Sequence, residues 1–211
     1  MNELLCLTAD KNIAAALEAL LGQRQPALGI RKFSYEIIVH PRRDPGCYYE
    51  GAAMLRGFLT APEAKGLLVF DFAWEGNPHA NARETEDFVT SQLEKMHLHD
   101  RTAVIVLEPE IETWVWTDSP HVAGELGWNN LGQLRSWLES QDLWTPGQSK
   151  PHDPKKALEA ALKEKRIPRS SSIYRHLATK VSLAKCQDQA FARLRQVLQR
   201  WFPPSSGGQQ P

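Results

Sequence analysis

Apolar residues in the first half of the chain occur either in short continuous runs or at helical spacing. Residues 4–7, 66–72 and 103–107 are continuous runs, and the second contains Leu67-Leu68-Val69-Phe70. A strand that is apolar at every position is typical of a parallel sheet with both faces covered. Residues 33–39 are rich in β-branched and aromatic side chains, which predicts a further strand.

Segments with apolar residues at helical spacing separate these strands. Residues 13–21, 48–59 and 84–96 are predicted helices, and Gly22 is placed to end the first of them. Residues 41–46 have the composition of a loop. The alternation of strand and helix predicts an α/β protein with a mostly parallel, four-stranded sheet flanked by helices.

No strand pattern follows residue 107, and the second half of the chain has helical periodicity. Five further helices are predicted, at residues 110–116, 131–139, 154–165, 171–181 and 188–201. The predicted organisation is an α/β core (residues 1–118), a helical extension packed on that core (119–202) and a tail that is disordered by composition (203–211).

Charge is unevenly distributed along the chain, although the formal net charge of the 211 residues is zero. Residues 1–148 hold 12 Lys/Arg and 21 Asp/Glu, whereas residues 149–211 hold 13 Lys/Arg and 4 Asp/Glu. One interpretation is that the basic end packs on the acidic part of the same chain. The other is that the basic end contacts nucleic acid.

Other features narrow the class of protein. Three scattered cysteines fit reduced thiols better than a disulfide framework or a zinc site. No apolar stretch approaches the roughly 20 residues that cross a bilayer, and the start of the chain lacks a secretory signal. We therefore expect a cytoplasmic protein with no membrane partner. The motifs of P-loop, α/β-hydrolase and dinucleotide-binding proteins are absent from the sequence.

Acidic residues follow two of the predicted central strands. Asp71 ends the apolar run of the third strand, Glu75 lies in the next loop, and Glu110 and Glu112 follow the fourth strand. Ligands of parallel α/β sheets bind beyond the carboxyl ends of the strands. The predicted ligands of Mg²⁺ or Mn²⁺ are Asp71, Glu75 and Glu110. The predicted catalytic residues are Asp71, Glu110 and Glu112.

These acids also have a structural interpretation. Asp71 would then cap a neighbouring helix or pair with an arginine, because an acid directly after four large apolar residues is costly to bury alone. Glu110 and Glu112 would complement the dipole in the first turn of a helix.

Basic residues cluster in the predicted C-terminal helices. They form a candidate surface for nucleic acid or a partner protein, or else a solvated helix face. The residues of this predicted basic surface are Lys150, Lys155, Lys156, Lys163, Arg166, Arg169 and Arg175.

Several short motifs resemble a known family. They are Glu110-Ile111-Glu112-Thr113-Trp114, Lys150-Pro151-His152-Asp153-Pro154-Lys155-Lys156, Tyr174-Arg175-His176, and Cys186 with Phe191. With the order of elements over residues 3–200, they resemble small stand-alone Toprim-like proteins found beside ATPases in bacterial defence islands. That family is related to the overcoming-lysogenization-defect nucleases. Within it, the chain looks most similar to a component of methylation-associated anti-phage defence systems, which implies a Toprim-like core.

The resemblance also implies an acidic site, from which this chain departs. A Toprim site has a glutamate at the end of the first strand, an acid four residues later and Asp-x-Asp after the third strand. Here these positions hold Thr8, Asn12 and Asp71-Phe72-Ala73, so one acid of four remains.

The first expectation is therefore a degenerate Toprim-like subunit of an anti-phage defence system. It would bind other subunits, with an ATPase as the candidate partner, and DNA or RNA through its basic C-terminal third. One alternative is an active divalent-metal-dependent nuclease with a rearranged acidic site. The other is a protein-interaction adaptor with no nucleic-acid role.

Overall fold

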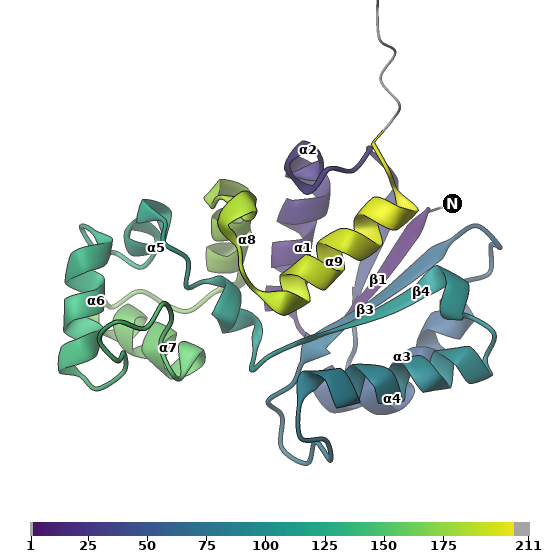
Figure 1. Ribbon diagram of the computed structural model, residues 1–211, viewed down its shortest axis with the longest axis horizontal. Coiled ribbons are helices and arrows are strands. Elements are labelled where there is room, and N and C mark those ends of the chain that lie inside the picture. The colour runs from purple at the N-terminus through teal and green to yellow at the C-terminus, as the bar shows by residue number, and fades with distance from the viewer. Residues whose placement is uncertain (1, 205–211) are drawn as a thin grey trace, which may run out of the picture.

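A four-stranded parallel sheet forms the centre of the computed structural model, which describes residues 2–204 (Figure 1). The sheet has the order β2-β1-β3-β4, and each neighbouring pair is parallel. The predicted α/β class and the four predicted strands are confirmed. The strands are β1 (Leu4–Thr8), β2 (Tyr35–Val39), β3 (Lys65–Asp71) and β4 (Thr102–Leu107).

Helices cover both faces of this sheet, which explains the continuously apolar strands. Helices α1 (Lys11–Gln23), α8 (Ser171–Lys180) and α9 (Gln189–Trp201) lie on one face, and α3 (Arg43–Phe58) and α4 (Ala82–Lys95) lie on the other (Figure 1). The inner strand β3 is buried at all positions after its first, whereas the edge strand β2 is only partly buried.

The strand order reverses at β1. The chain passes from β1 outward to β2, then crosses back to β3 on the other side of β1. In the register of the sheet Thr8 pairs with Val69, so β1 and β3 reach the same edge. A reversal of this kind leaves a crevice at the carboxyl ends of the strands, where ligands of open α/β sheets bind.

The predicted helical extension has two parts in the structure. Helices α8 and α9 belong to the layer that covers the sheet, packing against α1 and β4. Helices α5 (Pro120–Glu125), α6 (Leu131–Ser140) and α7 (Pro154–Glu164) lie beyond the carboxyl ends of the strands, where α5 contacts α8 (Figure 1).

Some predicted boundaries were wrong. The predicted helix 110–116 is a single 3₁₀ turn, Ile111–Trp114, closed by hydrogen bonds such as Val115 N–H to Glu112 O at 3.0 Å. Helix α5 and the one-turn helix α2 (Gln25–Leu28) were not predicted, because neither is long enough to show apolar periodicity. Helix α1 continues through Gly22 to Gln23.

Two further predictions concern the end of the chain and the membrane. Residues 205–211 of the predicted disordered tail lie outside the described residues. Across residues 2–204, every helix is too short or too polar to span a bilayer.

Candidate functional site

A polar cleft lies at the carboxyl edge of the sheet, at the reversal between β1 and β3. Its volume is about 640 Å³. One side of the cleft is formed by the turn after β1, the end of β2, the start of α3 and the end of β3. The other side is formed by Glu110 and Glu112 after β4 and by Lys155, Arg169 and Ser170 from the C-terminal half. The charged side chains that line it are Asp10, Lys11, Arg43, Asp44, Asp71, Glu110, Glu112, Lys155 and Arg169.

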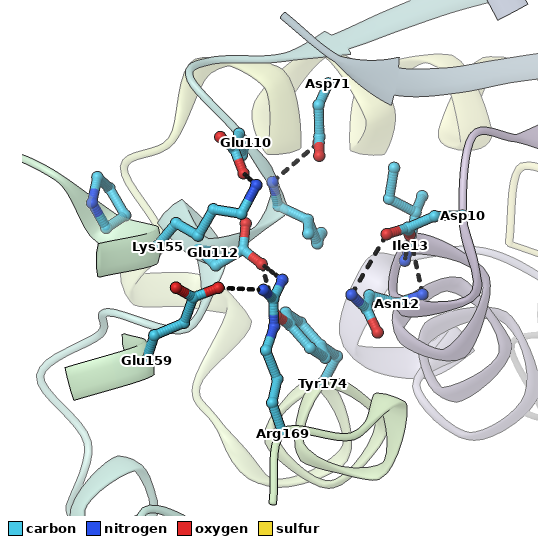
Figure 2. A network of polar contacts seen from close by, with 12 residues as sticks. Asp10, Asn12, Ile13, Asp71, Glu110, Glu112, Lys155, Glu159, Arg169 and Tyr174 are labelled. Atoms are coloured by element: carbon cyan, nitrogen blue, oxygen red, sulfur yellow. Dashed lines mark hydrogen bonds and ion pairs between the residues drawn. The ribbon is translucent and has the colours of Figure 1, made fainter. Parts of the chain in front are cut away.

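Three carboxylates converge at one end of this cleft (Figure 2). Asp71, Glu110 and Glu112 each place one oxygen within 4.8 Å of the others, and we call them the carboxylate cluster. Asp71 is 9% exposed and Glu112 is 1% exposed. Carboxylates this close and this buried repel one another unless a proton or a cation lies between them.

Asp71 is held by two backbone contacts. Its Oδ1 accepts a hydrogen bond of 2.9 Å from the Ile111 N–H, the first residue of the 3₁₀ turn. Its own N–H donates to Oδ1 of Asp44 at 2.8 Å. Burial, followed by the nearby charges of Asp44 and Glu112, raises the pKa of Asp71 well above its ordinary value. Asp71 thus also accepts from the first N–H group of a short helix, a contact of the kind that its structural interpretation describes.

Glu112 is fixed by residues from the C-terminal half of the chain. Its Oε1 accepts a hydrogen bond of 2.6 Å from the Tyr174 hydroxyl and a charged hydrogen bond from Arg169 (Figure 2). Its Oε2 is buried and has no hydrogen-bond partner among residues 2–204. Burial raises the pKa of Glu112, against the opposing effects of Tyr174 and Arg169.

Glu110 forms an ion pair with Lys155 at the start of α7. The two charged groups lie 2.7 Å apart, at the rim of the carboxylate cluster (Figure 2). The side chain of Glu110 is 16% exposed and that of Lys155 is 45% exposed. Both residues line the cleft, so this pair faces whatever enters it.

The positions expected for Toprim acids have local structural roles. The Thr8 hydroxyl donates to the carbonyl oxygen of Ile38 at 3.4 Å, which ties the ends of β1 and β2 together. Asp10 caps α1 by accepting from the N–H groups of Asn12 and Ile13, both at 2.9 Å. Asn12 donates back to Asp10 at 3.3 Å (Figure 2).

Glu75, a predicted metal ligand, is not brought to the carboxylate cluster. It is exposed in the loop between β3 and α4, and it belongs neither to the converging acids nor to the residues that line the cleft. The group that could hold a cation is therefore Asp71, Glu110 and Glu112, in place of the predicted set with Glu75.

Asp44 is a site residue that the sequence analysis missed. It lies in the first turn of α3, in a segment predicted as loop, and it lines the cleft beside Asp71. Burial, partly opposed by backbone hydrogen bonds, raises the pKa of Asp44. The rule that directed attention to Asp71 would have found it, because it follows the end of β2 at the same edge of the sheet.

The predicted basic surface is divided between internal ion pairs and solvent. Four of its residues pair within the chain: Lys150 with Asp188, Lys155 with Glu110, Arg169 with Glu112 and Glu159, and Arg175 with Glu18. The other three are exposed: Lys156, Lys163 and Arg166. Part of the charge asymmetry is thus neutralised inside the molecule, as one of the two interpretations predicted.

Comparisons with protein-family models, with curated proteins and with solved structures found no match for this chain. The Toprim-like resemblance therefore remains a prediction from the motifs, and the functional argument rests on the cleft itself.

The carboxylate cluster has the donor set of a hard divalent cation. Mg²⁺ and Mn²⁺ prefer carboxylate oxygens and keep water molecules in their remaining positions. One oxygen each of Asp71, Glu110 and Glu112 lie within 4.8 Å of one another, and Glu112 also has a buried oxygen, Oε2, without a partner among residues 2–204. The residues present therefore fit such an ion.

Proposed function

We propose that this protein is a cytoplasmic, Toprim-like subunit of a bacterial anti-phage defence system. In this proposal it uses Mg²⁺ or Mn²⁺ in the cleft to hydrolyse phosphodiester bonds of nucleic acid. The observation that carries the proposal is the buried, unpartnered Oε2 of Glu112 within a group of three carboxylates. The place in a defence system is supported by the motif resemblance.

A buried oxygen without a partner is unfavourable enough to require explanation. Leaving a buried acceptor unsatisfied costs about 1–3 kcal/mol, and more when the group is charged. The folded chain nevertheless holds the other oxygen of Glu112 with Tyr174 and Arg169, so that the carboxylate is fixed in this orientation. A buried polar atom without a protein partner is commonly satisfied by an ordered water molecule or an ion, and the carboxylates of Asp71 and Glu110 close to Glu112 favour the ion.

The surrounding residues suit a phosphodiester ligand. A divalent cation held here would neutralise phosphate charge and lower the pKa of a coordinated water. Asp71, Glu110 and Glu112 would hold that ion, while the side chains of Lys11 and Arg43 on the cleft wall would attract the phosphate.

A non-catalytic subunit is the second candidate. It is favoured by the residues at the Toprim positions, since Thr8 and Asn12 are engaged in local hydrogen bonds and Ala73 has no ligand atom. In this candidate Lys155 and Arg169 are permanent counter-ions of the acids, and the exposed face of α7 binds a partner such as an ATPase.

Cleavage assays separate the two candidates. Single- and double-stranded DNA and RNA would be incubated with Mg²⁺ or Mn²⁺ and with wild-type protein, Asp71→Ala or the control Glu75→Ala. The proposed nuclease predicts metal-dependent cleavage that Asp71→Ala abolishes and Glu75→Ala retains. Absence of cleavage, both alone and with co-expressed neighbouring gene products, would favour the non-catalytic candidate.

A further inference from the structure

We propose that Lys155 is an exchangeable counter-ion of the carboxylate cluster. Its ammonium group pairs with Glu110 when no divalent cation is bound, and it moves to a phosphate of the ligand when a cation takes its place. This inference rests on the proposed function, because it assigns a role to Lys155 in the same site.

The two cationic side chains at the carboxylate cluster differ in how firmly they are held. Arg169 forms ion pairs with Glu112 and with Glu159, the latter at 2.7 Å, and donates a hydrogen bond to the Tyr174 hydroxyl at 3.2 Å. Its side chain is 30% exposed. Lys155 makes one ion pair, with Glu110, and its side chain is 45% exposed. Arg169 is therefore a fixed part of the site, whereas Lys155 can leave its partner and return to water.

The backbone of Lys155 is anchored even though its ammonium group is not. The carbonyl oxygen of buried Pro154 accepts a hydrogen bond of 2.9 Å from Nε1 of Trp116. Asp153 caps the same helix by accepting from the Lys156 N–H at 2.9 Å. The flexible four-carbon side chain of lysine lets the ammonium group change position while the backbone stays fixed. The ammonium group therefore remains inside the cleft or at its rim.

Electrostatics determines when the exchange occurs. A divalent cation on the carboxylate cluster would compete with the ammonium group for Glu110 and would repel it across a few ångströms. A phosphate that enters with the cation offers the displaced ammonium group a new anionic partner in the cleft. Lys155 would thus oppose cation binding in the empty site and favour phosphate binding in the occupied one.

Calorimetry with Mn²⁺ alone tests the first half of the inference. Lys155→Met removes the charge and keeps the length of the side chain, and Lys156→Met is the matched control on the exposed side of the same turn. We expect Lys155→Met to bind Mn²⁺ about tenfold more tightly than wild type, as removal of one unit charge a few ångströms away implies. The control should bind like wild type.

A second titration tests the other half. With saturating Mn²⁺, the ligand is a 5′-phosphorylated oligonucleotide with phosphorothioate linkages, which resists cleavage. Lys155→Met should bind it about tenfold more weakly than Lys156→Met does. Opposite shifts for the cation and the phosphate ligand are not expected from a lysine that merely stabilises the fold.

Several results would overturn the inference. Weaker Mn²⁺ binding by Lys155→Met would show that the lysine holds Glu110 in place for the ion. Equal affinities for the two lysine variants, in either titration, would leave Lys155 without a special role while the proposed function stands. Mn²⁺ binding by none of the three proteins would overturn both proposals, provided that circular dichroism shows all three folded.

Discussion

Replacement of Asp71 by asparagine should stabilise the cation-free protein. The asparagine side chain is nearly isosteric with that of aspartate, and its Oδ1 could still accept the hydrogen bond from the Ile111 N–H. The substitution removes one negative charge from a group whose oxygens lie within 4.8 Å. A stabilising substitution at a buried polar residue is unusual, and it is expected where a site is held in a strained state for its ligand.

The magnitude follows from Coulomb's law. Two unit charges 4.8 Å apart repel by about 3 kcal/mol at an effective dielectric constant near 20. Burial first, and the neighbouring carboxylates second, raise the pKa of Asp71 and favour its protonated form, which lessens this repulsion. We therefore expect a gain of about 1–2 kcal/mol in the free energy of unfolding near neutral pH, or about 2–8 °C in Tm.

The pH dependence gives the sharper signature. In the unfolded chain the carboxyl group of Asp71 loses its proton near its ordinary pKa of 3.8, whereas in the folded protein its pKa is well above that value. Between the two values the native state holds the extra proton, so the stability of the wild type falls as pH rises. The Asp71→Asn variant does not lose stability in this way. The difference in free energy of unfolding between the variant and the wild type should therefore grow as pH rises between the two pKa values.

Urea unfolding at a series of pH values measures this effect, with EDTA present. Glu75→Gln is the control, since it removes an exposed acid from the loop that follows β3. Addition of Mn²⁺ at neutral pH should stabilise the wild type and the control but not Asp71→Asn. A variant that is less stable than wild type at pH 8, or an advantage that does not change with pH, would refute charge repulsion in the carboxylate cluster.

Two further substitutions test the hydrogen bonds that hold Glu112 in the site and Glu86 against the edge of the sheet. Tyr174→Phe removes the hydroxyl that donates to Glu112 and should lower the free energy of unfolding by about 1–2 kcal/mol, measured in urea. Glu86→Ala should lower it by about 2–3 kcal/mol, because the buried carboxylate accepts from the Val106 N–H of the edge strand and from Arg193. Light scattering should also show increased aggregation for Glu86→Ala, since it exposes the edge of β4.

The strands could be predicted from the sequence because burial on both faces leaves a strong compositional signal. Predicted residues 66–72 and 103–107 differ by one residue at their ends from β3 and β4. The α-helix predicted at residues 110–116 was wrong because the local sequence does not distinguish it from a 3₁₀ turn. Acids in the first turn suit an α-helix and a 3₁₀ turn equally, and the contact of this segment with α7 is a tertiary feature.

The candidate site could be predicted only in part. The rule that ligands bind beyond strand ends directed attention to Asp71, Glu110 and Glu112, because Asp71 ends β3 and the two glutamates follow β4. The partners of Glu112 could not be found in this way. Arg169 and Tyr174 lie 57 and 62 residues further along the chain, and apolar periodicity carries no information about contacts at that distance.

The ion pairs at the cleft change the meaning of the charge asymmetry. Part of the basic C-terminal third pairs with acids of its own chain, and Lys155 and Arg169 reach the carboxylate cluster itself. A cleft lined by this many acids would repel phosphate unless cations accompany it. The overall basic end therefore does not by itself select a nucleic-acid ligand. The choice of ligand would instead depend on the charges at the carboxylate cluster. There Arg169, Lys155 and a divalent cation would share three carboxylates.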